Sequence, residues 1–411
     1  MGISLAFHIV FAVIGIAMPA LMVIAEALWH RSGDVEDYNL AKNWAKGTAV
    51  LFAVGAVSGT VLSFELGLLF PRFMDHAGPV IGMPFSLEGF AFFTEAIFLG
   101  IYLYGWQRVS RAMHIVSGII VALSGLASAA FVLVANAWMN VPRGFRIVNG
   151  RFIDIDPIAA MYTPFAAHEI VHMVVAAYMA TGFAVAGIHA FAILRGSATR
   201  FHRRALTISL FLAIPFALVQ PLIGDFAGKQ VARYQPLKLA AMEQLEQTEK
   251  SASIRIGPIE VPGALSWIAY GDRNAVVRGL REWPRSDWPH PIVRTSFRAM
   301  VALGMWMAAV SAYAILLRLR RRPWTDNRLL LWLLVITAPM GFLAIEFGWI
   351  VTEMGRQPWI IYGVMRTAAS VTPMRGLAVP FTIFMAVYVL LAVTVISILR
   401  SQVRATIEER E

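Results

Sequence analysis

The chain has 411 residues, of which 58% are hydrophobic and only 15% are charged. Soluble domains carry about 25% charged residues, so this composition excludes a soluble protein and indicates a chain that crosses a membrane several times. Cysteine is absent, which excludes disulfides and iron–sulfur or copper sites that need thiolate ligands.

Nine apolar stretches are long enough to cross about 30 Å of hydrocarbon. In chain order they lie near residues 4–28, 46–70, 86–107, 112–139, 165–195, 202–225, 297–318, 329–352 and 378–399. The first is too long for a cleaved signal peptide and lacks a basic start, so we expect it to be a membrane helix. The fold class predicted is an all-α integral membrane protein, a bundle of about nine transmembrane helices.

Basic residues gather in every second connection between these helices. The positive-inside rule therefore places the N-terminus outside and the C-terminus in the cytoplasm. The net charge of +10 reflects this topology and gives no reason to expect a nucleic-acid partner. The cytoplasmic set is Arg31, Lys42, Lys46, Arg108, Arg111, Arg195, Arg200, Arg203, Arg204, Arg320, Arg321, Arg322, Arg328, Arg400, Arg404 and Arg410.

One connection, residues 226–296, is much longer than the others and lies outside on this topology. Connections longer than about 15 residues are usually functional or disordered. We therefore divide the chain into residues 1–225 with the first six helices, the external segment 226–296, and residues 297–411 with the last three helices and a cytoplasmic tail.

Polar residues inside the predicted helices fall near the outer side of the membrane. Such residues are costly in hydrocarbon and mark functional sites. They are His8 and Glu88 near the starts of the first and third helices, Glu95 two turns deeper, His168 and His172 at the start of the fifth, and Glu353 at the end of the eighth. Met300, an apolar residue whose sulfur is a potential ligand, lies at the same depth in the seventh.

The segment Glu353-Met-Gly-Arg-Gln-Pro-Trp359 is the most informative of these. A carboxylate at the end of a membrane helix must be paired, protonated or bound to a metal. Arg356 and the aromatic residues Trp349 and Trp359 surround it in the sequence. An arginine and two tryptophans near a membrane carboxylate are typical of a site that binds a buried redox cofactor.

Imidazole and thioether sulfur together fill both axial positions of a low-spin haem iron, whereas a haem with one protein ligand keeps a position open for oxygen. His8 and Glu353 are candidates for such single ligands. Arg298, two residues before Met300, could pair with a haem propionate. Each residue alone also fits a structural role, as a hydrogen-bonded core histidine or a packing methionine, and His168 competes with His172.

Several motifs resemble subunit I of the cytochrome bd-type quinol oxidases, and the resemblance covers nearly the whole chain. The specific motifs are Leu133-Val-Ala-Asn-Ala-Trp-Met139 and Gly355-Arg-Gln-Pro-Trp359. Further matches are Phe7-His8, Glu88-Gly89 with Phe92-Phe-Thr-Glu95, Val171-His172, Gly224-Asp225, Gln235-Pro236, Lys238-Leu-Ala-Ala-Met-Glu243, Phe297-Arg-Ala-Met300 and Glu346 with Gly348-Trp349.

The resemblance implies three haems. It assigns His172 and Met300 to a low-spin haem b, with Arg298 tuning it. It assigns His8 and Glu353 to two high-spin haems, a haem b and a haem d or a further haem b. We expect Arg356 and Trp349 to line the cofactor site.

The resemblance also implies roles for four further residues. Glu88 and Glu95 would serve proton delivery and charge compensation near the oxygen site, although a structural pair is the alternative. Lys238 and Glu243 would lie in an extracytoplasmic quinol loop, residues 226–296, and contribute to quinol oxidation. Without the resemblance, this charged external segment predicts a solvated face.

The expected function is that of the haem-bearing subunit of a terminal quinol oxidase in the bacterial plasma membrane. It would oxidise quinol at the outer face and reduce dioxygen to water with protons from the cytoplasm, so charge separates without pumping. The resemblance implies membrane lipid and a second, haem-free subunit as partners, and allows a small single-helix subunit.

The alternative from another class is a proton- or cation-coupled secondary transporter. Transporters usually show internal repeats and binding sites at the membrane midplane. This chain shows no repeat, and its polar residues lie toward one side. A haem–copper oxidase would need an adjacent histidine pair, and a cytochrome b of the quinol–cytochrome c reductase type would need histidines paired along two helices; neither pattern is present.

Overall fold

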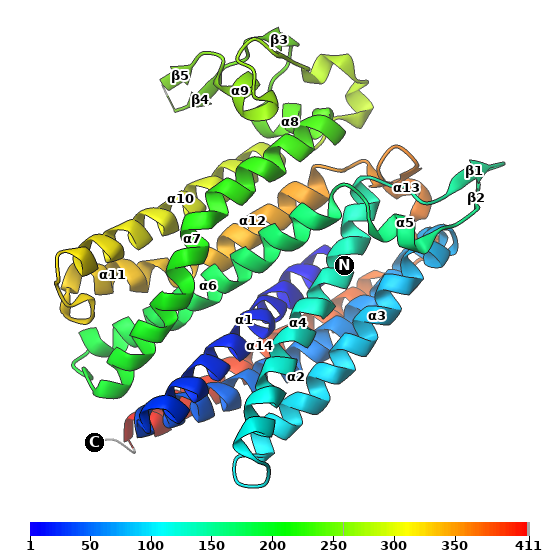
Figure 1. Ribbon diagram of the computed structural model, residues 1–411. Coiled ribbons are helices and arrows are strands. Elements are labelled where there is room, and N and C mark those ends of the chain that lie inside the picture. The colour runs from blue at the N-terminus through cyan, green and yellow to red at the C-terminus, as the bar shows by residue number, and fades with distance from the viewer. Residues whose placement is uncertain (258, 409–411) are drawn as a thin grey trace.

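The computed structural model describes residues 1–257 and 259–408, and these form a long helical bundle with small appendages at one end (Figure 1). Within the described residues, nine helical segments are long and apolar enough to cross a membrane, which confirms the predicted fold class. They are α1 (Gly2–Ser32), α2 (Val35–Leu69), α3 (Pro71–Tyr104), α4 (Arg111–Asn140), α6 (Ala166–Leu194), α7 (Arg200–Tyr234), α10 (Ile292–Leu319), the pair α11 (Arg328–Thr337) and α12 (Met340–Met354), and α14 (Ala378–Glu408).

Two helices begin well before the apolar stretches that predicted them. α2 begins at Val35 rather than near residue 46, with the Asp34 side chain capping its first turn. Its polar first turns are held by the buried Asp37, which pairs with Arg204 of α7 at 2.7 Å. α3 begins at Pro71 rather than near residue 86. Glu88 therefore lies in the middle of α3 and not near its start.

The eighth membrane segment is broken into α11 and α12 at Ala338 and Pro339. Proline has no backbone N–H to donate within a helix, so the break follows from the sequence. The break lies against α6: a Cβ added at Gly187 of α6 would come within 2.6 Å of the Ala338 side chain. Close packing between backbones fixes the direction in which α12 carries Glu353.

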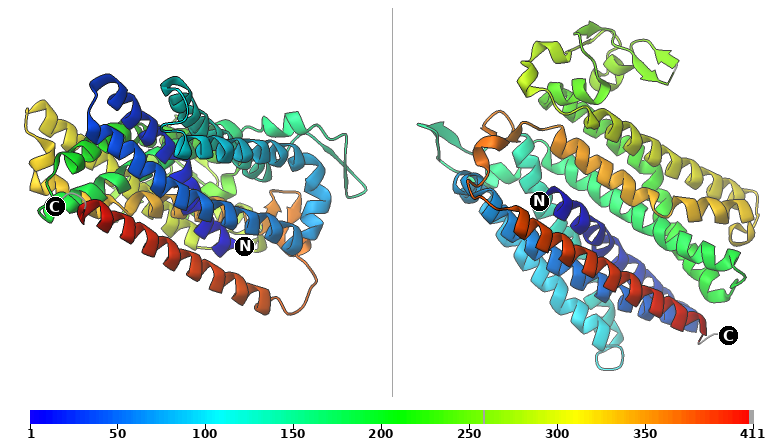
Figure 2. Two further views of the ribbon diagram at one scale, coloured as in Figure 1. Left: turned by 90° about the horizontal axis from the view of Figure 1, so that it is seen from below. Right: turned by 180° about the vertical axis from the view of Figure 1, so that it is seen from behind.

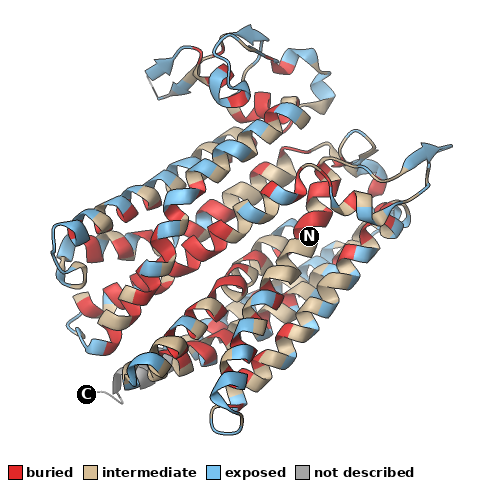
Figure 3. Ribbon diagram, in the orientation of Figure 1, coloured by how far each residue is buried: buried red, intermediate tan, exposed pale blue. Residues whose placement is uncertain are grey.

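The helices form two neighbouring groups joined along α6 (Figure 1). One group is α1–α4, and the other is α6, α7, α10, α11 and α12. Buried residues concentrate where α6 and α7 meet their neighbours, while the outward faces of the bundle are exposed (Figure 3). α14 lies outside the first group against α2, and the start of α1 and the end of α14 lie toward opposite ends of the bundle (Figure 2).

Most short elements gather at one end of the bundle, which we call the loop-rich end (residues 141–165, 235–291 and 355–377; Figure 1). It carries the antiparallel hairpin β1 (Arg146–Val148) and β2 (Arg151–Ile153), α5 (Pro157–Met161), the hairpin β7 (Trp359–Ile361) and β8 (Met365–Arg366), and α13 (Thr367–Ser370). Asn149 and Gly150 turn the first hairpin with positive φ angles, which an Asn-Gly pair adopts readily.

The long segment between α7 and α10 forms a small folded unit at this same end. It consists of α8 (Pro236–Glu243), β3 (Glu249–Lys250), β4 (Ile254–Ile256), β5 (Ile259–Val261), α9 (Ala264–Tyr270), β6 (Val276–Val277), η1 (Leu280–Glu282) and η2 (Arg285–Asp287). β3 pairs with β6 and β4 with β5, both antiparallel. Helix α7 extends beyond the predicted boundary at residue 225 to Tyr234, so the unit stands above the bundle on α7 and α10.

The opposite end, which we call the arginine-rich end, carries the connections 33–34, 105–110, 195–199 and 320–327, the last with η3 (Trp324–Asp326). The expected alternation of basic and less basic connections therefore corresponds to two physical ends. Of the basic residues predicted for the tail, Arg410 lies outside the described residues, and the side chain of Arg404 is not described.

Candidate functional site

His8 of α1 lies against α2, where one hydroxyl and one glycine define its position. Its Nδ1 is 2.9 Å from Ser58 Oγ. Ser58 Oγ also lies 2.8 Å from the Val54 carbonyl and 3.1 Å from the Gly55 carbonyl, so its proton has backbone acceptors and the oxygen can accept a hydrogen bond from His8 Nδ1. This arrangement favours the tautomer with a lone pair on Nε2, the nitrogen a metal would use.

Gly59 completes this contact. A Cβ added at Gly59 would lie 3.0 Å from His8 Cε1, closer than side chains normally approach. The glycine therefore leaves room for the Cε1 edge of the imidazole to approach α2.

His172 of α6 faces α7. Gln220 Nε2 donates to the backbone carbonyl of His172 at 3.2 Å. The same Gln220 nitrogen lies 3.4 Å from Nε2 of the His172 ring. Gly224, one turn further along α7, would place an added Cβ 3.7 Å from His172 Cε1. Met300 of α10 has a corresponding neighbour in α12, where a Cβ added at Gly348 would lie 3.1 Å from its sulfur.

His168 is one turn before His172 and is also buried, at 6% exposed. Its ring packs edge-on against Phe165 and Phe226, and its Nδ1 has no hydrogen-bond partner in the described part of the chain. The structure thus keeps His168 and His172 as distinct neighbours at the loop-rich end.

Glu353 at the end of α12 is held by both of its oxygens. Asn136 of α4 donates to Oε1 at 2.6 Å, and Arg356 donates to Oε2 at 2.7 Å. Arg356 is 1% exposed, yet its Nε and Nη1 have no partner among the described residues. A buried guanidinium with unused donors can bind further carboxylate oxygens.

Lys238 of α8 belongs to the same polar cluster. Its sequence neighbourhood alone predicts a solvated face, and the structure places it elsewhere. It is 2% exposed, and its ammonium donates to Asn140 Oδ1 at 2.8 Å. Its stem packs on Gly355, where an added Cβ would lie 3.0 Å from Lys238 Cε. Burial and then the charge of Arg356 lower the pKa of Lys238. The charge pattern could not reveal this, because the partners come from α4 and α12.

Glu243, at the other end of α8, faces a different surface. It is half-buried between α8 and the start of α10, where Arg294 and Arg298 supply its nearest positive charges. Burial raises the pKa of Glu243, and the two arginines oppose that rise. Arg298 Nη2 also donates to the Arg255 carbonyl of β4 at 2.8 Å, so its guanidinium reaches the folded unit above α10.

Glu88 and Glu95 of α3 face α4. Ser128 donates to Glu88 Oε1 at 3.2 Å. Glu95 is 6% exposed, and a Cβ added at Gly125 of α4 would lie 3.4 Å from its Oε1. The two carboxyl groups therefore lie along one α3–α4 interface, as the two-turn spacing predicts.

Trp349 packs between α12, α1 and α6, against a cluster that contains Ile9, Val13 and Ala176. It thus lies between the helices that carry His8 and His172. Its indole is part of the apolar cluster in which α1, α6 and α12 meet.

Sequence reasoning missed Ser58, Gln220, Asn140 and Glu169, and gave Asn136 no role. Asn136 lies in one of the specific motifs, and its spacing of four residues from Asn140 could have indicated that the two side chains meet on one helix face. Asn140 Nδ2 does donate to the Asn136 side chain at 3.0 Å. Glu169 has a buried Oε2 without a partner and lies near the charges of Lys238, Arg356 and Glu353.

The residues present fit haem. Unpartnered buried polar atoms of His168, Glu169 and Arg356 gather at the loop-rich end of α6 and α12, where propionates could bond to the donors. No group of three or more His, Asp or Glu side chains able to hold a bare metal ion occurs in the described residues. A porphyrin supplies four nitrogen ligands itself, so one or two side chains are sufficient for its iron.

A membrane-helix bundle with potential iron ligands on facing helices defines a class, the multi-pass redox proteins that hold cofactors inside the bundle. Comparisons with known proteins then specify the family. The family described as cytochrome bd terminal oxidase subunit I matches residues 1–407. The chain belongs to this family, a bacterial multi-pass membrane protein family of respiratory quinol oxidases that contain haem.

Individual relatives agree with this membership. A Bacillus subtilis protein provisionally named a cytochrome bd menaquinol oxidase subunit I is 36% identical over 97% of this chain and 94% of its own length. The B. subtilis cytochrome bd ubiquinol oxidase subunit 1 is 30% identical over 89% of this chain and 83% of its own length.

The solved bd oxidase from Geobacillus thermodenitrificans superposes with a TM-score of 0.93 at 36% identity, covering 98% of this chain and 96% of that one. The expected enzyme class, quinol:oxygen oxidoreductase, is thereby confirmed. Membership also implies quinol, dioxygen and a second subunit as partners.

Proposed function

We propose that this subunit binds three haems near the loop-rich end, oxidises quinol there and reduces dioxygen to water. In this proposal His172 and Met300 hold a low-spin haem b. His8 and Glu353 each hold one high-spin haem, a haem b and a haem d or a further haem b.

The contact of three ligand candidates with glycine carries the proposal. His8, His172 and Met300 come from three helices, and each abuts a glycine on a neighbouring helix: Gly59, Gly224 and Gly348. Glycine at these positions leaves room beside the ligand where any other residue would place a side chain.

The haems, when bound, would supply one-electron transfer and an open iron position for oxygen. The side chains described here would set the conditions for that chemistry. Ser58 keeps Nε2 of His8 deprotonated, so the ring is ready to bind metal. Arg356 compensates the charge of Glu353, while its remaining donors and Lys238 favour further anionic groups nearby.

Proton delivery is assigned to Glu88 and Glu95. Their carboxyl groups lie along the α3–α4 interface. The Ser128 hydroxyl donates to Glu88 there, and because a hydroxyl can both donate and accept a hydrogen bond, it can take part in proton transfer. We place the arginine-rich end in the cytoplasm, with the N-terminus outside. The protons consumed in reducing dioxygen would enter from the cytoplasmic, arginine-rich end. Quinol would release its protons outside, so charge separates across the membrane without a pump.

Quinol is assigned to the segment 226–296 and the adjoining end of α7. A pocket of about 390 Å³ lies between α7 and α9, lined by Phe226, Lys229, Gln230, Arg233, Ala269, Tyr270 and Gly271. Its size falls in the range of small-molecule sites, about 300–1,000 Å³. Phe226 also packs on His168, with ring centroids 6.3 Å apart, so this pocket adjoins the His172 region.

Glu243 is half-buried on the loop side of α8 and lies outside the lining of this pocket, so we assign it the onward acceptance of the quinol proton toward the outer surface and not direct contact with quinol. Lys238 supports the electrostatics of the Glu353 cluster instead of contacting quinol. This refines the expectation that both act together in quinol oxidation.

Further partners would cover the apolar outside of the bundle. Phe64, Phe90 and Phe93 on α2 and α3 are more than half exposed, which suits contact with lipid or another membrane helix. A small single-helix subunit is one such partner.

A reduced-minus-oxidised spectrum of the purified two-subunit oxidase, with pyridine haemochrome analysis, tests the proposal. His172→Ala and Met300→Ala should each remove the low-spin haem signal because one axial ligand is lost. Met305→Ala, an exposed methionine of the same helix, is the matched control and should leave every band unchanged. Retention of the low-spin signal in both ligand variants would contradict the assignment, and a colourless preparation would favour transport.

A further inference from the structure

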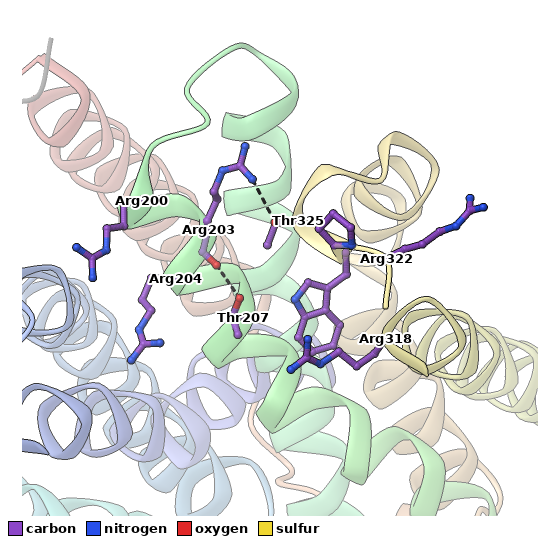
Figure 4. Close-up of a pocket in the computed structure, with 9 residues that line it drawn as sticks. Arg200, Arg203, Arg204, Thr207, Arg318, Arg322 and Thr325 are labelled. Carbon is purple, nitrogen blue, oxygen red and sulfur yellow. Dashed lines mark hydrogen bonds between the residues drawn. The ribbon is translucent and has the colours of Figure 1, made fainter. Parts of the chain in front are cut away.

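The arginine-rich end carries a second pocket, far along the bundle from the proposed haem sites. It is open, has a volume of about 320 Å³, and lies between the start of α7, the end of α10 and η3 (Figure 4). Its lining residues are Arg200, Arg203, Arg204, Thr207, Arg318, Arg322, Pro323, Trp324 and Thr325. Nothing in the oxidase reaction requires such a concentration of arginine here.

Three of the five arginines have carboxylate partners. Arg200 pairs with Asp34 at 2.6 Å and Arg204 with Asp37 at 2.7 Å, and both side chains turn to one side of the pocket (Figure 4). Arg203 pairs with Asp326 and also donates to Thr325.

Arg318 and Arg322 differ from these three. Both are exposed, and neither has a carboxylate partner in the described part of the chain. The pocket therefore keeps an excess of two positive charges, together with the hydroxyl groups of Thr207 and Thr325.

The pocket also has an apolar wall that continues toward the membrane. The Arg318 guanidinium lies 6.0 Å from the centre of the Trp324 ring. Phe211, two turns beyond Arg204 on α7, packs edge-on against Trp324 with centroids 5.9 Å apart and is 64% exposed. Leu218 and Leu222 lie further along the same face of α7 and are also exposed.

We propose that this pocket binds the phosphate group of an anionic phospholipid, whose acyl chains lie along Phe211, Leu218 and Leu222. Arginine recognises phosphate through its planar fork of donors. Tryptophan favours the membrane interface, and basic pockets between membrane helices on the cytoplasmic side bind anionic lipid headgroups. Free phosphate shares the charge chemistry, but it would make no use of the apolar stripe on α7.

The test compares two double variants of the intact two-subunit oxidase in detergent after delipidation. Arg318→Gln/Arg322→Gln removes the two unpaired charges of the pocket. Arg320→Gln/Arg321→Gln makes the same charge change in the same connection but outside the lining. Haem spectra, which should be unchanged in both, verify that each variant is folded. The probes are phosphatidylglycerol, phosphatidylcholine and inorganic phosphate at equal ionic strength.

Phosphatidylglycerol should raise the unfolding temperature of the wild type and the control variant, and the pocket variant should need roughly 10–30-fold more lipid for the same shift. Native mass spectrometry should show the same ranking in retained anionic lipid. Equal responses of the two double variants would overturn the site. An equal response to phosphatidylcholine would overturn the role of charge, and an equal response to inorganic phosphate would overturn the lipid as ligand.

Discussion

The surroundings of His8 and those of Glu353 differ in how the rest of the chain supports a potential iron ligand. His8 has the Ser58 hydroxyl and the Gly55 backbone as its polar neighbours, beside an apolar contact between α1 and α2. Glu353 stands in a cluster that draws Asn136 from α4, Arg356 from the following turn and, through Asn140, Lys238 from α8.

The difference follows from the chemistry of the two ligands. A neutral imidazole needs only its second nitrogen satisfied, whereas a carboxylate near the membrane needs compensating charge. Changes near His8 should therefore act on one haem alone. Changes near Glu353 should spread through the cluster and affect folding as well, since networked polar groups are not additive.

Arg356→Ala should have the largest effect because it leaves Glu353 without its charge partner. Breaking a buried ion pair costs about 3–5 kcal/mol, and since Glu353 keeps 30% of its side chain exposed we expect the lower part of that range. The unfolding temperature and the haem content should both fall. Arg356→Lys retains the charge but not the fork, so it should recover stability more than haem binding. Wild-type stability in Arg356→Ala would contradict the network.

Gly59→Ala should lower the occupancy of one high-spin haem, and any loss of stability should come from that lost haem and not from the helix itself. The added methyl would press on His8 Cε1 at 3.0 Å, while alanine favours the helix over glycine by about 1 kcal/mol. Gly67→Ala in the same helix meets no atom within 4 Å and serves as the control. Haem analysis and thermal unfolding distinguish the two. Equal haem content in both variants would show that His8 needs no such clearance.

Ser58→Ala should weaken haem at His8 to a smaller degree. Loss of a hydrogen-bond partner behind a metal ligand typically costs about 10–100-fold in affinity. Ser58→Thr keeps the hydroxyl and should recover most of it. Haem retention during dilution and the Fe–His stretching band by resonance Raman are the measurements. An unshifted band in Ser58→Ala would exclude the proposed control of the tautomer.

Glu243→Gln should have the smallest effect, confined to quinol turnover with all haem bands retained. If Glu243 accepts a quinol proton, it must be deprotonated, and burial raises its pKa. The wild-type rate should then fall as pH decreases through this raised pKa, at higher pH than for an ordinary glutamate. Glu243→Gln should be slower and lose this acidic limb. A wild-type pH profile in the variant would remove Glu243 from the reaction.

Hydropathy predicted every membrane segment because each must be apolar over its hydrocarbon-facing length. It missed the polar first turns of α2 and α3, since partners such as Arg204 for Asp37 come from elsewhere in the chain. The same reason explains the site. Motifs pointed to Glu353 and Arg356, but the buried position of Lys238 and the roles of Ser58 and Asn136 depend on contacts between distant segments that a single sequence does not contain.

The central claim is that single side chains from α1, α6, α10 and α12 hold three haem irons at the loop-rich end. An experimental density map of the intact oxidase tests it most directly. We predict porphyrin density with iron bound by His8 Nε2, by His172 together with Met300, and by Glu353. Iron bound by His168 in place of His172, or Glu353 bonded only to Asn136 and Arg356, would contradict the account.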